Sequence, residues 1–149
     1  MKRQANIMHP DYRAMAEFRY QIRRFLRFSE VAARKAAIEP QQYLMMLALK
    51  GMPHGSRARI REMAERLQIQ HHSTVELADR LVAKGLLKRE RAEDDRREVL
   101  LELTPRGERL LRELALHHRE VLRALAPELV RSLRKLVRNG SSRRGQVAE

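Results

Sequence analysis

A run of polar side chains stands at the start of an expected short helix. It comprises Gln70, His71, His72, Ser73 and Thr74. A glutamine side chain can pair with adenine, and serine and threonine hydroxyls adapt to several base edges. The first residues of a helix that lies in the major groove are the ones that reach those edges. The run therefore predicts base contacts, and Arg80, further along the same helix, predicts a phosphate contact.

A second group places acids beside arginines in one charged turn, residues 93–97. Asp95 and Arg97 are two residues apart, so we expect an ion pair that orients the guanidinium. An oriented Arg96 or Arg97 guanidinium fits a narrow minor groove, where the potential is most negative. Further cations are expected to contact phosphates, and they are Lys88, Arg89 and Arg91 beside the turn and Arg57, Arg59 and Arg61 ahead of it.

The remaining reactive side chains form no catalytic or metal-binding pattern. The chain has no cysteine, which excludes disulfides, thiolate zinc sites and cysteine nucleophiles. Two His-His pairs, at 71–72 and 117–118, point about 100° apart on a helix, so neither pair chelates a metal naturally. Asp94 and Asp95 are adjacent in an exposed turn and are unsuited to paired acid–base work. We expect no enzyme activity, no metal and no cofactor.

Composition favours a polyanionic partner. The chain has 149 residues, room for one domain, and its 32 Lys and Arg against 19 Asp and Glu give a net charge of +13. Aromatic residues are only 4% and tryptophan is absent, which disfavours a base-stacking platform for single strands. No apolar run reaches the length of a membrane span, and the first ten residues lack the apolar core of a signal peptide. We therefore expect a cytoplasmic protein.

Apolar spacing predicts mostly helix with one hairpin. Helices are expected at about 11–36, 41–50, 59–67 and 72–84, then from Pro105, with a last one opened by Pro127. Two strands are expected at 86–91 and 98–103, around the charged turn. Gly85 is expected to end one helix as a C′ glycine, and Thr104 to cap the next.

The two short helices before the hairpin predict a helix-turn-helix. Its small core is expected from Ile60, Met63, Ala64, Leu67, Ile69, Val75, Ala78 and Leu81. A helix-turn-helix followed by a β-hairpin is a winged helix-turn-helix. The predicted fold class is therefore mainly α with a small β-hairpin wing, an α+β fold.

Several motifs in this part of the chain agree in order and spacing with one family. They are Met63-Ala64-Glu65-Arg66-Leu67, Ser73-Thr74-Val75, the stretch 79–86, Asp95-Arg96-Arg97 and the stretch 103–107. Through them, residues 60–107 resemble the multiple-antibiotic-resistance regulator (MarR) family of winged helix-turn-helix transcription regulators, whose wing signature falls on Asp95, Arg96 and Arg97. With its flanking helices the resemblance covers about residues 11–137.

The resemblance implies a homodimer that binds a palindromic DNA operator and represses transcription. It implies that the first helix and the Leu-rich C-terminal helices interlock with those of a second copy. It also implies release by a small aromatic or phenolic ligand. The matching pocket wall is Phe18, Ile22, Tyr43, Met46 and Leu47, with Arg19 or Arg23 as a carboxylate partner. Methionine and aromatic residues at helical spacing are more often core, so core packing is the alternative reading of these positions.

The expected organisation has four parts. An N-terminal arm covers 1–10, a helical dimerisation region covers 11–36 and 104–138, the DNA-binding lobe covers 37–103, and a disordered basic tail covers 139–149. The basic residues near the C-terminus contact flanking DNA or form a solvated face. Two other functions use the same composition: a structured-RNA-binding or architectural nucleic-acid-binding protein, and a small-molecule binder that has lost its DNA function.

Overall fold

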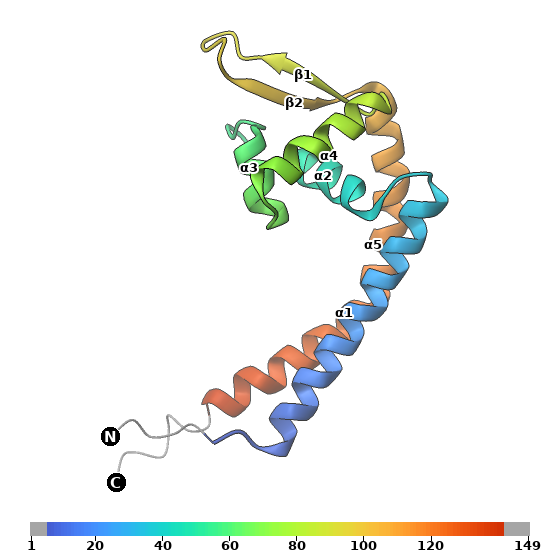
Figure 1. Cartoon of the computed structure of the whole chain (residues 1–149). Helices are drawn as coiled ribbons and strands as arrows, with labels where there is room; N and C mark the ends of the chain where they lie inside the picture. The colour runs from blue at the N-terminus through green and yellow to red at the C-terminus, as the bar shows by residue number, and fades with distance from the viewer. Residues whose placement is uncertain (1–5, 142–149) are drawn as a thin grey trace, which may run out of the picture. The chain divides into compact units, whose positions relative to one another are not determined.

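A computed structural model describes residues 6–141, with side-chain surroundings as far as residue 138. The predicted arm and tail fall partly outside these residues, at 1–5 and 142–149. The elements in chain order are α1 (His9–Lys35), α2 (Pro40–Lys50), α3 (Ile60–Leu67), α4 (His71–Ala83), β1 (Leu87–Arg91), β2 (Val99–Leu103) and α5 (Pro105–Ser141) (Figure 1). The predicted fold class, mainly helical with one β-hairpin, is confirmed.

The chain divides into two compact units. One contains Glu30–His117, which we call the winged lobe. The other contains the described residues of both chain ends, up to Ser29 and from His118 onward. Both α1 and α5 begin in one unit and end in the other.

The expected elements match the observed ones closely, with one exception. The prediction that Pro127 opens a separate helix is wrong, because α5 continues through it. Proline lacks the N–H that would bond the carbonyl four residues earlier, which kinks a helix without always ending it. Figure 1 shows α5 changing direction in its last third. Helix-favouring residues on both sides of Pro127 carry α5 onward.

The core of the winged lobe is built from α2, α3, α4 and the hairpin. Its largest fully buried side chains include Met45, Met46, Met63, Leu81 and Leu87. Methionine fills irregular gaps between helices because its side chain is unbranched and flexible. This packing fixes α4 against α2 and α3, and so fixes which face of α4 meets solvent.

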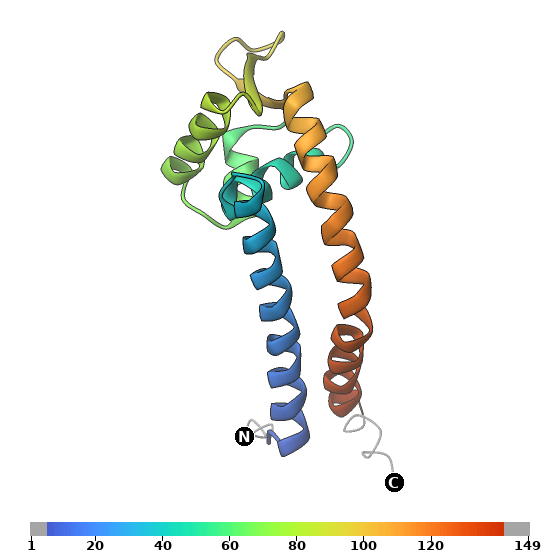
Figure 2. The same ribbon diagram turned by 90° about the vertical axis from the view of Figure 1, so that its right-hand side faces the viewer.

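The hairpin is an antiparallel pair with a simple register. Leu87 pairs with Leu103, and Arg91 pairs with Val99. Leu101 and Leu103 alternate with the exposed Glu102, so one face packs on the lobe. The strand also extends toward the segment before α3, because the Leu101 N–H donates to the Ala58 carbonyl at 2.8 Å. Figure 2 shows the hairpin projecting beyond the helices of the lobe.

Two cap predictions are confirmed where α4, the hairpin and α5 meet. Gly85 has φ of +71° and follows α4, with the Leu86 N–H donating to the Leu81 carbonyl. The Thr104 hydroxyl accepts from the Gly107 N–H at 3.1 Å and donates to the Gly85 carbonyl at 2.6 Å. One threonine side chain therefore joins the end of α4 to the start of α5.

The second unit joins the first part of α1 to the later part of α5. His118 is buried and its Nε2 lies 2.9 Å from the Ser29 hydroxyl oxygen. The rings of Phe25 and Phe28 meet the His118 ring edge-on, with centroids 6.0 and 5.1 Å away.

Among the described residues, no helix has the length and hydropathy of a membrane span.

Gly107 tests the junction between α4 and α5. A Cβ added at Gly107 would lie 2.1 Å from the backbone oxygen of Leu86, a distance that requires backbone movement. We expect Gly107→Ala to lower the free energy of unfolding by about 1–3 kcal/mol. The measurement is chemical denaturation. Gly51→Ala is the control, because its added Cβ would meet only the Leu47 oxygen, at 3.2 Å. Equal stability of the two variants would contradict the close approach.

Candidate nucleic-acid interface

The first turn of α4 exposes most of the side chains expected to read bases. Gln70 occupies the N-cap position and is exposed, as are His71 and His72, while Ser73 is half-buried. The first turn carries no acidic residue. The first turn of α4 therefore offers neutral and basic hydrogen-bonding groups to solvent, with no carboxylate to repel a phosphate.

Thr74 departs from the sequence expectation. Its side chain is fully buried, and its hydroxyl donates to the Gln70 carbonyl at 2.9 Å. The buried face of α4 consists of Thr74, Leu77, Ala78 and Leu81, a spacing of i, i+3, i+4 and i+7. Thr74 therefore packs the helix-turn-helix, and it leaves the set of base-reading candidates.

Two outward positions of α4 were missed by the sequence reasoning. Val75, expected in the core, is half-exposed, and Glu76 beside it is exposed. An aliphatic side chain at this place can contact the methyl group of thymine, and a glutamate can accept from the amino group of cytosine. The signal was present in the sequence, because the spacing of 74, 77, 78 and 81 fits a buried helical face better than a face through Val75.

Arg57 and Arg59 are tied to the wing rather than free. Arg57 forms ion pairs with Asp94 and Glu98, and Arg59 pairs with Glu98 and lies 3.5 Å from Glu62. We call these five residues the wing clamp. Glu98 is its centre, since its carboxylate bonds both arginines and its side chain is only 15% exposed. The clamp holds the turn of the hairpin against the segment before α3.

The ion pair between Arg57 and Asp94 in the wing clamp depends on the ionisation of Asp94. The hydrogen bond from Arg57 is the main cause that lowers the pKa of Asp94, and the same bond raises the pKa of Arg57. A carboxyl whose pKa falls on folding contributes stability above its ordinary pKa and loses it only in more acidic solution. The Asp94 contact is therefore intact at neutral pH.

The tip of the wing is ordered by its backbone. The Asp95 carboxylate accepts from the backbone N–H of Arg97 at 3.0 Å. The expected ion pair between Asp95 and the Arg97 guanidinium does not form among the described residues, because that carboxylate turns toward the backbone instead. Arg91 adds a second brace, donating to the Arg96 carbonyl at 2.6 Å. These bonds shape the turn and leave the side chains of Arg96 and Arg97 exposed.

Two cations predicted to contact phosphate have partners in the protein. Arg89 pairs with Asp79 and so ties β1 to α4. Lys88 lies 2.9 Å from Glu90 and 3.3 Å from Glu102, and its hydrogen bond to Glu90 is the main cause that raises its pKa. Both side chains are partly exposed. Their charges are largely neutralised at short range, which weakens their expected role at phosphates.

Other cations of the winged lobe remain exposed. Arg80, Arg96 and Arg97 have no ion-pair partner within the described part of the chain. Arg61 is 76% exposed and lies 3.5 Å from Glu62. The structure thus separates the basic residues of the lobe into those that hold the wing and those that face solvent on α3, α4 and the wing.

The predicted ligand-binding residues fall in both units. Phe18 and Ile22 are half-buried and Arg19 and Arg23 exposed on α1, in the unit of the chain ends. In the winged lobe, Tyr43 and Met46 are buried in the core, where burial raises the pKa of the Tyr43 hydroxyl. Leu47 is 41% exposed. It lines a cavity of about 510 Å³, whose other walls are Lys50, Glu108, Arg109, Leu111, Arg112 and Ala115.

The described residues contain no group of three or more side chains suited to hold a metal ion. His71 and His72 lie at the start of α4, and His118 is engaged with Ser29.

A family comparison covers most of the winged lobe. The model of the MarR family matches residues 38–98. A curated relative, the HTH-type transcriptional repressor MdtR of Bacillus subtilis (strain 168), is 35% identical over 74 residues, which is 50% of this chain and 46% of that protein. The chain thus spans about half the length of this relative.

Solved structures share the fold over more of the chain. AbsC, a MarR family transcriptional regulator from Streptomyces coelicolor, has a TM-score of 0.70 at 22% identity, over 96% of this chain and 100% of that one. A MepR variant of S. aureus bound to an oligodeoxyribonucleotide has a TM-score of 0.61 at 18% identity, over 85% and 91%. Residues 38–98 therefore match the MarR family, and the chain as a whole shares its fold with solved MarR family structures.

Proposed function

We propose that this protein is a sequence-specific DNA-binding transcription regulator. It acts as a repressor, binds a palindromic operator as a homodimer, and is released from DNA by a small aromatic or phenolic ligand. The chain's resemblance to the repressor MdtR over 74 residues supports the regulatory part. The fold that it shares with a MepR variant bound to an oligodeoxyribonucleotide supports the choice of DNA.

One observation carries the DNA-binding part of the proposal. The start of α4 and the tip of the wing expose groups that fit DNA, while ion pairs hold the neighbouring cations. Gln70, His71, His72 and Ser73 are assigned to base edges in the major groove. Arg96 and Arg97 are assigned to the minor groove, and Arg61 and Arg80 to phosphates. Positioning of the wing falls to the wing clamp, Arg89 and Asp95.

The exposed apolar side chains of the helical ends support a homodimer. Tyr12, Tyr20 and Leu26 on α1 are each about half exposed. On α5, Val130, Leu133 and Val137 are 42%, 44% and 68% exposed and line a cavity of about 570 Å³. Exposed apolar side chains that gather in one cavity, as these three do on α5, are typical of association sites. A second copy of the chain is assigned to this surface, within the proposed dimerisation region 11–36 and 104–138.

The cavity beside Leu47 is assigned to the effector. Leu47, Leu111 and Ala115 supply apolar wall, while Arg109 and Arg112 have no ion-pair partner among the residues that the structure describes. An apolar wall beside free guanidinium groups suits an aromatic acid, whose ring needs burial and whose carboxylate needs a cation. Lys50 and Glu108, which also line the cavity, pair with each other at 2.8 Å.

The wing arginines provide the most direct test of DNA binding. We expect Arg97→Ala to weaken binding to a duplex from upstream of the coding region by about 1–3 kcal/mol, if measured by fluorescence anisotropy. Arg119→Ala is the control, since Arg119 is exposed on α5 outside the winged lobe. The competitors are the unlabelled upstream duplex, a scrambled duplex and a structured RNA. Equal competition by all three would contradict sequence-specific DNA binding and favour a general nucleic-acid binder.

The same titration tests the effector. Benzoate and 4-hydroxybenzoate are the probes, and we expect either to lower the affinity for DNA in the unmodified chain. Arg112→Gln should reduce this release while leaving DNA affinity without the probe unchanged. Release that is identical in Arg112→Gln would remove the cavity beside Leu47 from the proposal.

The wing clamp predicts a change in DNA affinity that is opposite to the change expected from net charge alone. Removing an acid from a DNA-binding surface should strengthen DNA binding if only net charge matters. We expect Glu98→Ala to weaken it, because Arg57 and Arg59 lose their shared partner and the wing loses its fixed position. Hydrogen exchange at the Leu101 amide, which donates to Ala58, should rise in the same variant.

Glu93→Ala is the matched control for this experiment. Glu93 is an exposed acid in the same turn, outside the wing clamp. It should leave DNA binding unchanged or slightly tighter, with no rise in exchange at Leu101. If Glu98→Ala instead tightens DNA binding as Glu93→Ala does, the wing clamp has no positioning role.

A charge placed in the exposed apolar surface of α5 tests the homodimer. We expect Leu133→Glu to shift the protein from dimer to monomer in sedimentation equilibrium, because a buried unpaired carboxylate is costly. Arg123→Glu, at an exposed site on the same helix, should leave the dimer intact. A monomeric unmodified protein, or a dimer that survives Leu133→Glu, would place association elsewhere.

A further inference from the structure

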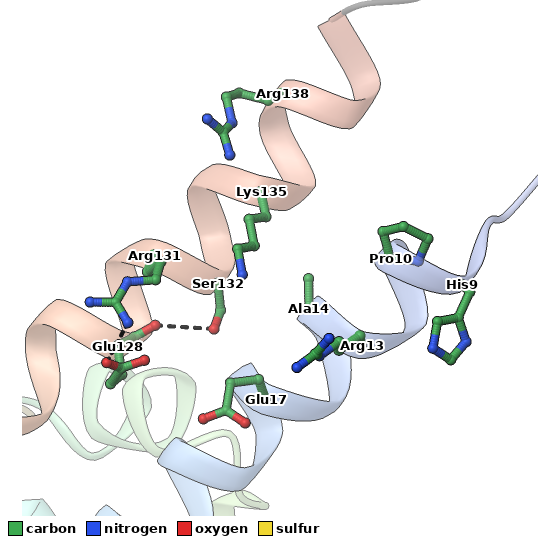
Figure 3. Close-up of a pocket in the computed structure, with 10 residues that line it drawn as sticks. All are labelled: His9, Pro10, Arg13, Ala14, Glu17, Glu128, Arg131, Ser132, Lys135 and Arg138. Atoms are coloured by element: carbon green, nitrogen blue, oxygen red, sulfur yellow. Dashed lines mark hydrogen bonds and ion pairs between the residues drawn. The ribbon is translucent and has the colours of Figure 1, made fainter.

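A second cavity lies in the unit of the chain ends, and none of its lining residues belongs to the winged lobe. It has a volume of about 510 Å³ and is formed by the first turns of α1 and the last turns of α5 (Figure 3). Its floor contains Ala14 and Ser132, each 3% exposed. These small side chains leave space between the two helices. A volume in this range suits a small molecule.

The walls of this cavity are mainly charged. Four Lys and Arg residues face two glutamates, which leaves two positive charges in excess. Figure 3 shows Lys135 pointing from α5 toward α1, with Arg13 and Glu17 on the α1 side of the same space. Cations from two different helices therefore converge on one small volume.

Protein partners satisfy only part of this charge. Arg131 donates to the Glu128 carboxylate at 2.6 Å, and Glu17 accepts from the Gln21 side chain at 2.8 Å. The Ser132 hydroxyl donates to the Glu128 carbonyl at 3.0 Å. Arg13 and Lys135 have no ion-pair partner among the described residues. Two cations, one on each helix, are thus available to a ligand.

We propose that this cavity binds a small polyanion, a molecule that carries two or more phosphate or carboxylate groups. Arg13 and Lys135 each hold one anionic group, so the ligand bridges α1 and α5. An arginine fork matches phosphate and carboxylate alike, and lysine adds a point charge. A ligand with a single charge satisfies one helix only and is bound more weakly. The site is separate from the DNA-binding groups of the lobe and from the cavity beside Leu47.

Isothermal titration calorimetry tests this site on the full chain without DNA. The probes are pyrophosphate and citrate, with sodium chloride adjusted so that the ionic strength stays constant. We expect at least one probe to bind saturably with one site per chain, and the tighter of the two identifies the preferred group. Absence of saturable binding by both would overturn the proposal. Since no DNA is present, this failure leaves the proposed DNA-binding function untouched.

Charge-removing variants locate the binding. Loss of one charge-assisted hydrogen bond should weaken the bound probe about tenfold, so we expect this loss in Arg13→Gln and again in Lys135→Gln. Arg123→Gln is the matched control, because Arg123 is an exposed cation on α5 that does not line the cavity. Thermal unfolding without the probe checks that all three variants keep their fold. Equal weakening in Arg123→Gln, or none in Arg13→Gln and Lys135→Gln, would show that the probe binds the general positive surface instead.

Discussion

The carboxylate of Glu98 is the contact on which the proposed interface depends. It forms ion pairs with Arg57 and Arg59 together and so attaches the hairpin to the chain segment before α3. A two-stranded hairpin has little stability by itself, so a wing needs such an anchor. The backbone bond between Leu101 and Ala58 runs beside it. Together they hold the wing in the same compact lobe as α4, and a fixed spacing between these two elements is what lets them meet adjacent grooves of one duplex.

Ion pairing divides the basic residues of the lobe into two groups. Arg57, Arg59 and Arg89 form ion pairs with Asp94, Glu98 and Asp79, and their role is structural. The guanidinium groups of Arg80, Arg96 and Arg97 form no such pair in the described residues and are available to a binding partner. The net charge of +13 explains attraction to a polyanion, but it does not reveal this division. The acids of the wing, which reduce the positive charge, stabilise the geometry that the free arginines require.

Periodicity and local capping were enough to predict most of the fold. Apolar spacing located α2, α3, α4 and the hairpin, and Thr104 and Gly85 marked helix ends by their own chemistry. The prediction that a new helix begins at Pro127 is wrong because a proline occurs both at the start of a new helix and at a kink within a continuing one. The prediction for Thr74 and Val75 is wrong because the buried face of α4 includes Thr74 beside Ala78 and Leu81, and Val75 lies at its margin. The partners of Arg57 lie 37 and 41 residues away, so no local pattern reveals them.

Chemical footprinting of the bound operator tests the central claim most directly. That claim is that α4 and the wing of each lobe meet neighbouring grooves of the same duplex. Methylation at guanine N7 reports the major groove, and hydroxyl-radical cleavage reports the minor groove. The account predicts two major-groove protections about one DNA turn apart, each flanked by a minor-groove protection that Arg96→Ala and Arg97→Ala together remove. Minor-groove protection that persists in this double variant, or major-groove reactivity that stays unprotected, would contradict the account.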